Sequence, residues 1–302
     1  MVREACTFLF LLVLVLQGVA HAQMRGPGGH RNPAQATVDV DQPDDADEQD
    51  LQPRQIQRLR AMADQGGPNA FRALQQLRKT SVDLGDFGTA LAISRQQLGL
   101  QLGPAQRHTV LVGMVAMHSS LHQLTEAQAS LNELERNMED LRSTRRWEKN
   151  REWWQAGLAK ARAQFETQAG HLEAAEQAWQ ACIAAIHAAA ELTPDREDRA
   201  LVVDCHRGLM GVLMTTGQLA AASQVAAQMR LSAERILSIR NRPDMLIRVN
   251  HALAQLALEQ GRFDQAEVII AAALKAIEGS GQAGSSFLVL VLRKQQAELD
   301  ML

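Results

Sequence analysis

The segment LALEQGRFDQAEVIIAAALKAIE, residues 256–278, carries a glycine, an aromatic residue two positions later and an alanine three further on, between two apolar runs. On both sides of the glycine, apolar residues recur at the three- and four-residue spacing of an amphipathic helix. Gly261 gives the backbone the freedom that a tight turn needs, and Ala266 lets a second helix approach the first. The segment therefore predicts a helical hairpin that bends at Gly261, with Phe263 filling its base.

Nearly the same phrase occurs earlier in the chain. The pattern G-x-[LF]-x-x-A begins at Gly85, Gly170, Gly217 and Gly261, whereas roughly half an occurrence is expected by chance. A degenerate copy, HQLTEA, begins at His122. Each copy lies between two segments with helical apolar spacing, so the sequence predicts about five successive helical hairpins.

A glycine hinge followed by an apolar residue and an alanine, between two amphipathic helices, resembles the tetratricopeptide repeat. The resemblance covers roughly residues 70–280 and is closest in the last copy, where Leu253 and Ala254 supply a small-apolar pair before the glycine. It implies an all-α chain folded as a right-handed α-solenoid, because a lone hairpin cannot bury its apolar face and stacked hairpins can. The copies are farther apart than the family's usual repeat, so longer helices are expected.

The N-terminal residues are typical of a secretory signal peptide. Arg3 precedes the apolar run FLFLLVLVL, and the small residues Ala20 and Ala22 then form a site for signal peptidase. We expect residues 1–22 to be a signal peptide, cleaved or retained as an anchor. The remainder is then exported to a periplasm or the extracellular space, with no stable membrane span after cleavage.

Residues 23–53 are rich in Gly, Pro and acids, with seven acids between Asp39 and Asp50. Such a composition predicts a disordered acidic linker, followed by the α-solenoid over residues 54–302. Beyond residue 50 the chain carries 28 bases and 26 acids. This balance, together with export, argues against nucleic acid as a partner.

The usual catalytic motifs for nucleotide, zinc-protease and serine-hydrolase chemistry are missing from the sequence. His118, His122 and Glu126 have the spacing of one helical face, but His122 occupies a hinge position, where a helix should stop. The adjacent residues Cys205 and His206 point in different directions on a helix and cannot share a proton. We therefore expect no catalysis, no cofactor and no metal; a helical metalloprotein using these histidines and Cys205 is the weaker alternative.

Cys182 and Cys205 flank Leu192-Thr193-Pro194, where proline should end a helix. In an antiparallel pair of helices the two cysteines lie at the same height, and export places them in an oxidising compartment. The spacing therefore leaves two outcomes open, a disulfide between consecutive helices or two buried free thiols.

Three tryptophans lie in RSTRRWEKNREWW, residues 142–154. Trp147 and Trp154 share a helical face and are expected to anchor an unusually long helix. Trp153 points elsewhere, so it is the candidate for a contact with a partner on a secondary surface.

In the tetratricopeptide family the first helix of each hairpin lines a concave groove. Counting back from each hinge glycine, the resemblance implies the following groove residues: Arg72, Gln75, Lys79, Lys160, Gln164, Arg207, Arg248, His251 and Gln255. The charged residues in this set are basic, and the acidic residues Asp83, Asp204 and Glu259 oppose them. We expect a non-enzymatic scaffold or adaptor that binds a protein or peptide in this groove, with the acidic linker as a competitor for it.

The C-terminal segment 286–302 begins FLVLVL and then turns polar. We expect a helix that caps the last hairpin. The alternative is a homo-oligomeric envelope-assembly protein, such as a homodimer, in which this apolar helix makes the contact.

Overall fold

The computed structural model describes residues 48–302 except 68, 193–198, 238–242, 279–286 and 300–302. Every regular element of this described part is an α-helix, which confirms the all-α prediction. The helices are α2 (Glu48–Asp64), α3 (Ala70–Asp83), α4 (Phe87–Leu98), α5 (Pro104–Ser120), α6 (Leu124–Arg142), α7 (Trp147–Ala169), α8 (Leu172–Leu192), α9 (Arg199–Thr215), α10 (Leu219–Leu237), α11 (Pro243–Glu259), α12 (Phe263–Glu278) and α13 (Phe287–Leu299).

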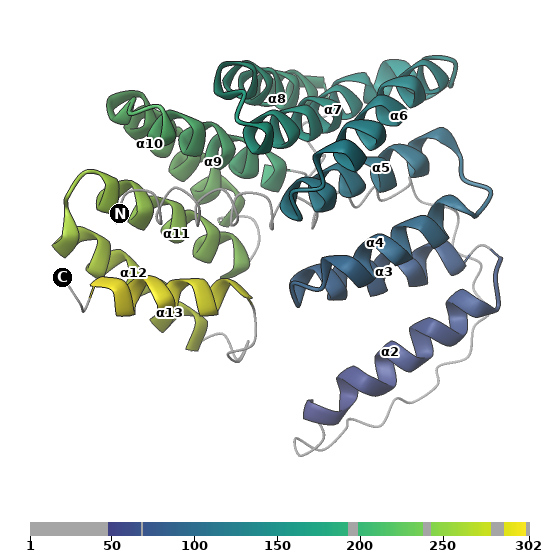
Figure 1. Cartoon of the computed structure of the whole chain (residues 1–302), viewed down its shortest axis with the longest axis horizontal. Coiled ribbons are helices and arrows are strands. Elements are labelled where there is room, and N and C mark those ends of the chain that lie inside the picture. Colours follow the sequence, from purple (N-terminus) through teal and green to yellow (C-terminus); the bar gives the residue numbers. More distant parts are fainter. Residues whose placement is uncertain (1–47, 68, 193–198, 238–242, 279–286, 300–302) are drawn as a thin grey trace.

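The helices follow one another along a curved path, with α2 near one end and α12 and α13 at the other (Figure 1). The most extensive contacts join helices that are consecutive in the chain, α5 with α6, α7 with α8, α8 with α9, α9 with α10, and α11 with α12, followed by α3 with α4. In addition, α7 contacts both α5 and α9, and α9 contacts α11. The odd-numbered helices from α5 to α11 thus form a continuous row.

The bends lie where the repeated phrase predicts them. Gly85, Gly170, Gly217 and Gly261 have φ angles of 77°, 80°, 76° and 70°, in the left-handed region that glycine tolerates. At Gly217, the next residue donates its N–H to the carbonyl of Leu213 at 2.8 Å, and the glycine donates to Met214 at 3.0 Å. This bond pair is the Schellman motif, and it recurs at each of these junctions.

The degenerate copy keeps the same turn without glycine. His122 has a φ of 55°, and it is the only non-glycine residue with a positive φ in the described part of the chain. Gln123 donates to the carbonyl of His118 at 2.9 Å, as the corresponding residue does at the glycine junctions. The chain therefore turns at His122 as it does at the four glycines, although histidine stands in place of glycine.

The alanine of the phrase is fully buried in all five copies, which confirms its predicted close packing. These residues are Ala90, Ala127, Ala175, Ala222 and Ala266, each 0% exposed. The prediction for the aromatic or leucine position is less accurate. Phe263 is 47% exposed, so it does not fill the base of the last hairpin. A side chain two residues past the hinge lies at the helix edge, and neighbouring contacts decide how far it is covered.

Gly217→Ala should lower the free energy of unfolding by roughly 1–2 kcal/mol, because an L residue is strained at positive φ. No atom lies within 4 Å of the Cβ that would be added there, so the effect isolates backbone strain. Chemical denaturation measures it. Gly88→Ala in α4 is the control, and should be neutral or stabilising by up to about 1 kcal/mol. Equal losses in the two variants would contradict the assignment.

The first described helix overlaps the last six residues of the expected linker. Helix α2 begins at Glu48 and includes Pro53, whereas the linker was expected to run to residue 53. Carboxylates such as Glu48 and Asp50 are favoured at a helix N-terminus by its partial positive charge, so acidic composition alone does not exclude a helix there. The predicted signal peptide and the rest of the linker lie outside the described residues.

The C-terminal helix packs against the last pair of helices. Helix α13 contacts α12 and α11, and Leu292 is fully buried in a cluster with Ile247, Ala254 and Ile270. This placement agrees with a helix that covers the end of the row. The side chains of 287–291 are not described. No helix within the described ranges is both long enough and apolar enough to cross a membrane.

The largest core cluster joins α7 to α11 and includes Trp179 of α8, which is 2% exposed. Its ring lies over Gly208 of α9, where an added Cβ would come within 2.4 Å of the ring. Gly208 therefore sets how closely α8 and α9 approach.

Gly208→Ala should lower the free energy of unfolding by about 1–3 kcal/mol, because the methyl group overpacks a rigid ring. A thermal or urea melt measures the loss. Combining Gly208→Ala with Trp179→Leu should give a smaller total loss than the sum of the two single losses, because the smaller side chain makes room. Simple additivity would show that the ring does not restrict this position.

Candidate functional site

The residues predicted to line the groove separate into two groups. On α3, Arg72 and Lys79 are exposed and Gln75 is half-buried. The other six are buried, and they lie on α7, α9 and α11: Lys160, Gln164, Arg207, Arg248, His251 and Gln255. The predicted groove residues of the first unit are thus at least partly accessible to solvent, whereas those of the later units are buried.

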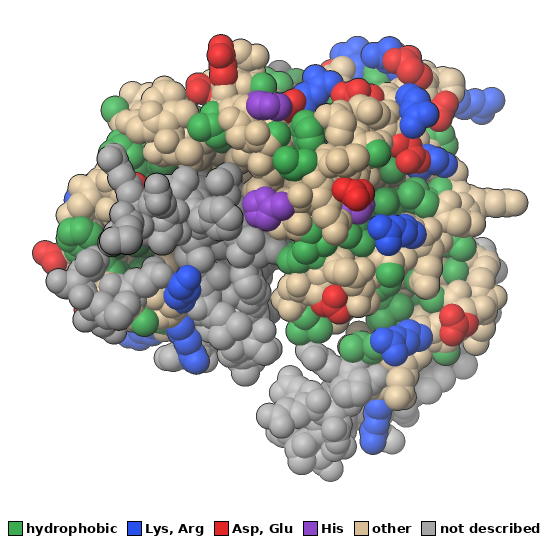
Figure 2. Space-filling model, in the orientation of Figure 1, with side chains coloured by type: hydrophobic (Ala, Val, Ile, Leu, Met, Phe, Trp, Pro, Cys, Tyr) green, Lys and Arg blue, Asp and Glu red, His purple; other side chains and the backbone are tan. Residues whose placement is uncertain are grey.

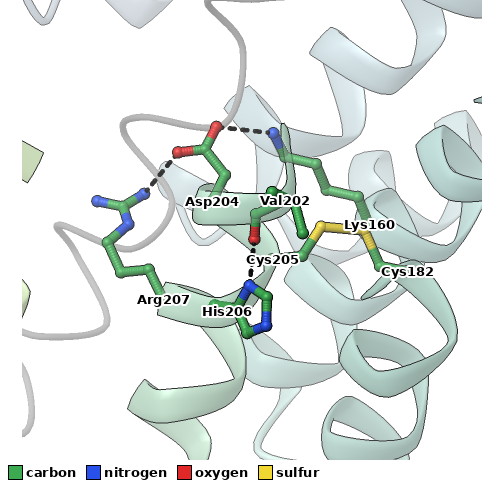
Figure 3. The surroundings of a disulfide bond; sticks show 7 residues. All are labelled: Lys160, Cys182, Val202, Asp204, Cys205, His206 and Arg207. Carbon is green, nitrogen blue, oxygen red and sulfur yellow. Dashed lines mark hydrogen bonds and ion pairs between the residues drawn. A yellow bond between two sulfur atoms is a disulfide. The ribbon is translucent and has the colours of Figure 1, made fainter. Parts of the chain in front are cut away.

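Three of the buried residues surround a carboxylate that was predicted only as an opposing charge, and the other three lie on α7 and α11. Lys160 donates from Nζ to Oδ2 of Asp204 at 3.3 Å, and Arg248 donates from Nη1 to Oδ1 at 3.4 Å. Arg207 lies on the same helix as Asp204, with its Nη2 3.8 Å from Oδ1. Figure 3 shows the Asp204 carboxylate between the Lys160 amine and the Arg207 guanidinium. We call Asp204 and the six buried residues the inner polar cluster.

The residues that meet here are far apart in sequence but have the same spacing from the bends of the chain. Lys160, Arg207 and His251 each precede their hinge glycine by ten residues, and Asp204 and Arg248 precede theirs by thirteen. Equivalent positions on stacked helices fall side by side. Since α7, α9 and α11 contact in turn, one face of each helix contributes to the cluster. Asp204 could have been identified from the sequence as a member of this group, because it precedes its hinge glycine by the same number of residues as Arg248 does.

Burial dominates the electrostatics of the cluster. Loss of water lowers the pKa of Lys160, while the neighbouring Asp204 carboxylate opposes this shift. Burial also lowers the pKa of Arg207 to about 10, so that its side chain remains charged at neutral pH. For His251, burial and then the nearby Arg207 charge lower the pKa to about 3. His251 is therefore a neutral hydrogen-bonding group near neutral pH.

Four polar atoms on the neutral members of the cluster have no hydrogen-bond partner within the described structure. They are Nε2 and Oε1 of Gln164, Nε2 of His251 and Oε1 of Gln255. The three side chains are 2%, 1% and 8% exposed, respectively. Buried polar atoms are normally satisfied, so a group of such atoms beside buried cations marks a place where a polar ligand would gain hydrogen bonds.

The side chains of the consecutive residues Asp204, Cys205 and His206 make separate contacts. Cys205 of α9 forms a disulfide with Cys182 of α8, with the two Cα atoms 6.3 Å apart. His206 contacts the carbonyl oxygen of Val202 through Nδ1 at 2.8 Å. Figure 3 shows that Cys205 and His206 leave α9 on a different side from the Asp204 carboxylate. Of the two outcomes left open by the cysteine spacing, the structure has the disulfide. Part of the turn between these helices lies outside the described residues.

The tryptophan segment anchors α7. The rings of Trp147 and Trp154 stack with centroids 5.8 Å apart, and Trp154 is 1% exposed. With 23 residues, α7 is the longest described helix, as predicted for this segment. Trp153, predicted as a contact residue on a secondary surface, is half-buried and packs against the largest core cluster. It is therefore not a freely presented aromatic side chain.

The histidines considered for metal binding do not share one helix. His118 lies in the last turn of α5, His122 occupies the left-handed turn, and Glu126 lies in α6. The Nδ1 atom of His118 lies 2.7 Å from Oε1 of Gln123. Among the residues that the structure describes, no group of three or more His, Cys, Asp or Glu side chains is arranged to hold a metal ion.

Away from the cluster, exposed charges of opposite sign are interspersed over α6 and α7 (Figure 2). Arg142 pairs with Glu139, Arg162 with Glu135, and Arg107 of α5 with Glu133. Such exposed pairs contribute little to stability, about 0–1 kcal/mol each. This surface therefore does not present one dominant charge to a partner.

Sequence reasoning also missed Arg78, the neighbour of the predicted groove residue Lys79. Arg78 is 4% exposed, and its Nε and Nη1 atoms have no hydrogen-bond partner in the described structure. Burial lowers its pKa to about 10. Helical periodicity could have found it, because Leu74, Leu77 and Arg78 share the buried face of α3.

Comparison of the chain with protein-family models, with curated proteins and with solved structures gives no match in any of the three. The likeness to the tetratricopeptide repeat thus stays a prediction from the repeated motif.

Proposed function

We propose that this chain is an exported, non-enzymatic scaffold built as an α-solenoid of tetratricopeptide-like hairpins, which binds a protein or peptide segment along the first helices of its hairpins, namely α3 and the continuous row α5, α7, α9 and α11. The observation that carries the proposal is the inner polar cluster. Three successive hairpins contribute equivalent positions to one group of buried cations and polar atoms. Burying polar side chains costs desolvation free energy, and apolar residues would pack the helices without that cost. Polar side chains at equivalent positions of successive hairpins therefore favour a role in binding a ligand.

Two further features support this assignment. The five bends share one turn geometry, as expected for repeats that stack in order. The disulfide between α8 and α9 suits an oxidising compartment, in agreement with the predicted export signal. Stacked helices also hold their side chains in fixed positions, so that little conformational entropy is lost when a ligand binds.

Site-specific photo-crosslinking tests the proposal. A photoreactive amino acid placed at Lys79, an exposed inner position on α3, should crosslink to a protein from extracts of the cells that make this chain. The same amino acid at Gln180, an exposed position on α8, is the matched control and should not. Equal capture from both positions would reject binding along the inner row.

A further inference from the structure

The first two described helices carry an excess of basic residues. Between residues 51 and 82 the chain has six bases and a single acid, Asp64. Five of the six bases are exposed, and we call these five the N-terminal basic surface: Arg54, Arg58 and Arg60 of α2, and Arg72 and Lys79 of α3. Like charges on two neighbouring helices repel one another, so this surface favours a negatively charged partner.

The N-terminal basic surface has no counter-charge among the described residues. None of its five side chains forms an ion pair with another residue that the structure describes. The exposed bases of α5 to α7 differ in this respect, since Arg107, Arg142 and Arg162 each pair with a glutamate. Compensating charge for the N-terminal basic surface must therefore come from solvent ions or from another segment.

An acidic stretch directly precedes α2 in the sequence. Residues 39–47, DVDQPDDAD, carry five acids and no base, and they lie outside the described residues. The chain enters α2 at Glu48. Arg54 and Arg58 lie six and ten residues further on, which is about 9 and 15 Å along the helix axis. Since nine extended residues span up to about 30 Å, the acidic stretch is long enough to fold back over both arginines.

Helix α3 brings a further base to the same end of α2. The two helices contact each other and lie side by side (Figure 1). They are joined by a short connection, so they run antiparallel. Arg54 lies ten residues before the end of α2, and Lys79 lies nine residues after the start of α3, so both are at about the same height. A segment that folds back from Glu48 therefore meets bases of both helices.

We propose that the N-terminal basic surface binds the acidic segment 39–47 of the same chain, with carboxylates of that segment pairing with Arg54, Arg58 and Lys79. A single exposed ion pair is weak. Attachment to α2 raises the effective concentration of the segment at this surface, on the order of millimolar, so that several pairs form together. The bound segment covers Lys79. It follows, if the proposed function holds, that an acidic ligand must displace the segment from the first hairpin.

Zero-length crosslinking of the full chain with a carbodiimide at low salt tests the proposal. The reagent joins a lysine amine to a carboxylate in contact with it, and mass spectrometry identifies the pair. Lys149 of α7 and Lys275 of α12 are also exposed and serve as controls. Lys79 should link to residues 39–47 at least about tenfold more often than either control, and less as salt rises. Equal yields at the three lysines would overturn the proposal.

A double variant separates binding from mere proximity along the chain. Arg54→Gln with Arg58→Gln leaves the attachment of the segment and Lys79 unchanged, and Gln suits an exposed helical position. The Lys79 link should fall at least about fivefold in this variant, because the attracting charges are gone. Arg145→Gln with Arg146→Gln, the same charge loss before α7, should change it less than about twofold. An unchanged link in the α2 variant would show that proximity alone accounts for it.

A mixture of isotopically heavy and light chains identifies the source of the carboxylates. Links within one chain join two peptides of the same isotope, as the proposal requires. Links that join heavy to light peptides would assign the carboxylates to a second copy and overturn it. These experiments contain no ligand, so their failure would leave the scaffold function, tested by photo-crosslinking, standing.

Discussion

Asp204→Ala should lower the free energy of unfolding by about 3–5 kcal/mol, because removing one partner of a buried ion pair leaves charge without compensation. Asp204 is 4% exposed and contacts three cations from α7, α9 and α11. Once the carboxylate is removed, Lys160, Arg207 and Arg248 repel one another in a region from which water is excluded. Urea denaturation followed by circular dichroism measures the loss.

Asp140→Ala is the matched control for this experiment. Asp140 is an exposed aspartate on α6, and the same substitution there should change stability by no more than about 0.5 kcal/mol. A loss below about 1 kcal/mol for Asp204→Ala would show that this carboxylate does not hold the three helices together. Adding Arg248→Met to Asp204→Ala should recover part of the loss, since one of the repelling charges is removed.

Replacing both Cys182 and Cys205 with Ala should lower the free energy of unfolding by about 3 kcal/mol. The disulfide closes a loop with a sequence separation of 23 residues, and it restricts the unfolded chain by roughly that amount. Denaturant titration of the oxidised wild type and the double variant gives the difference. The two cysteines should resist alkylation in the native protein until a reductant is added.

Wild-type protein with its disulfide reduced is the control for the double variant. With the bond broken and both thiols retained, its stability should fall close to that of the double variant, since the cross-link is the main contribution. Two thiols that react with an alkylating agent before reduction would contradict the disulfide. A reduced protein as stable as the oxidised one would show that the bond restricts little of the unfolded chain.

Local features of the fold were predictable because they depend on neighbours in sequence. A glycine that must adopt a positive φ, an alanine in close contact and a helical apolar period are each specified within a few residues, so Gly85, Gly170, Gly217 and Gly261 were placed correctly. His122 was also recognised from the phrase around it. The start of α2 at Glu48 was missed, because an acidic composition is compatible with a linker and with the first turn of a helix.

The sequence by itself determined where the chain is helical, where it bends, and which polar residues occupy equivalent positions before each bend. Only the tertiary structure decided that Lys160, Arg207 and Arg248 are buried around Asp204 while Arg72 and Lys79 stay exposed. The physical reason is that helical periodicity assigns a residue to a face of its own helix. Whether that face meets water or the next helix depends on contacts between segments separated by 44 residues, such as Lys160 with Asp204 and Asp204 with Arg248.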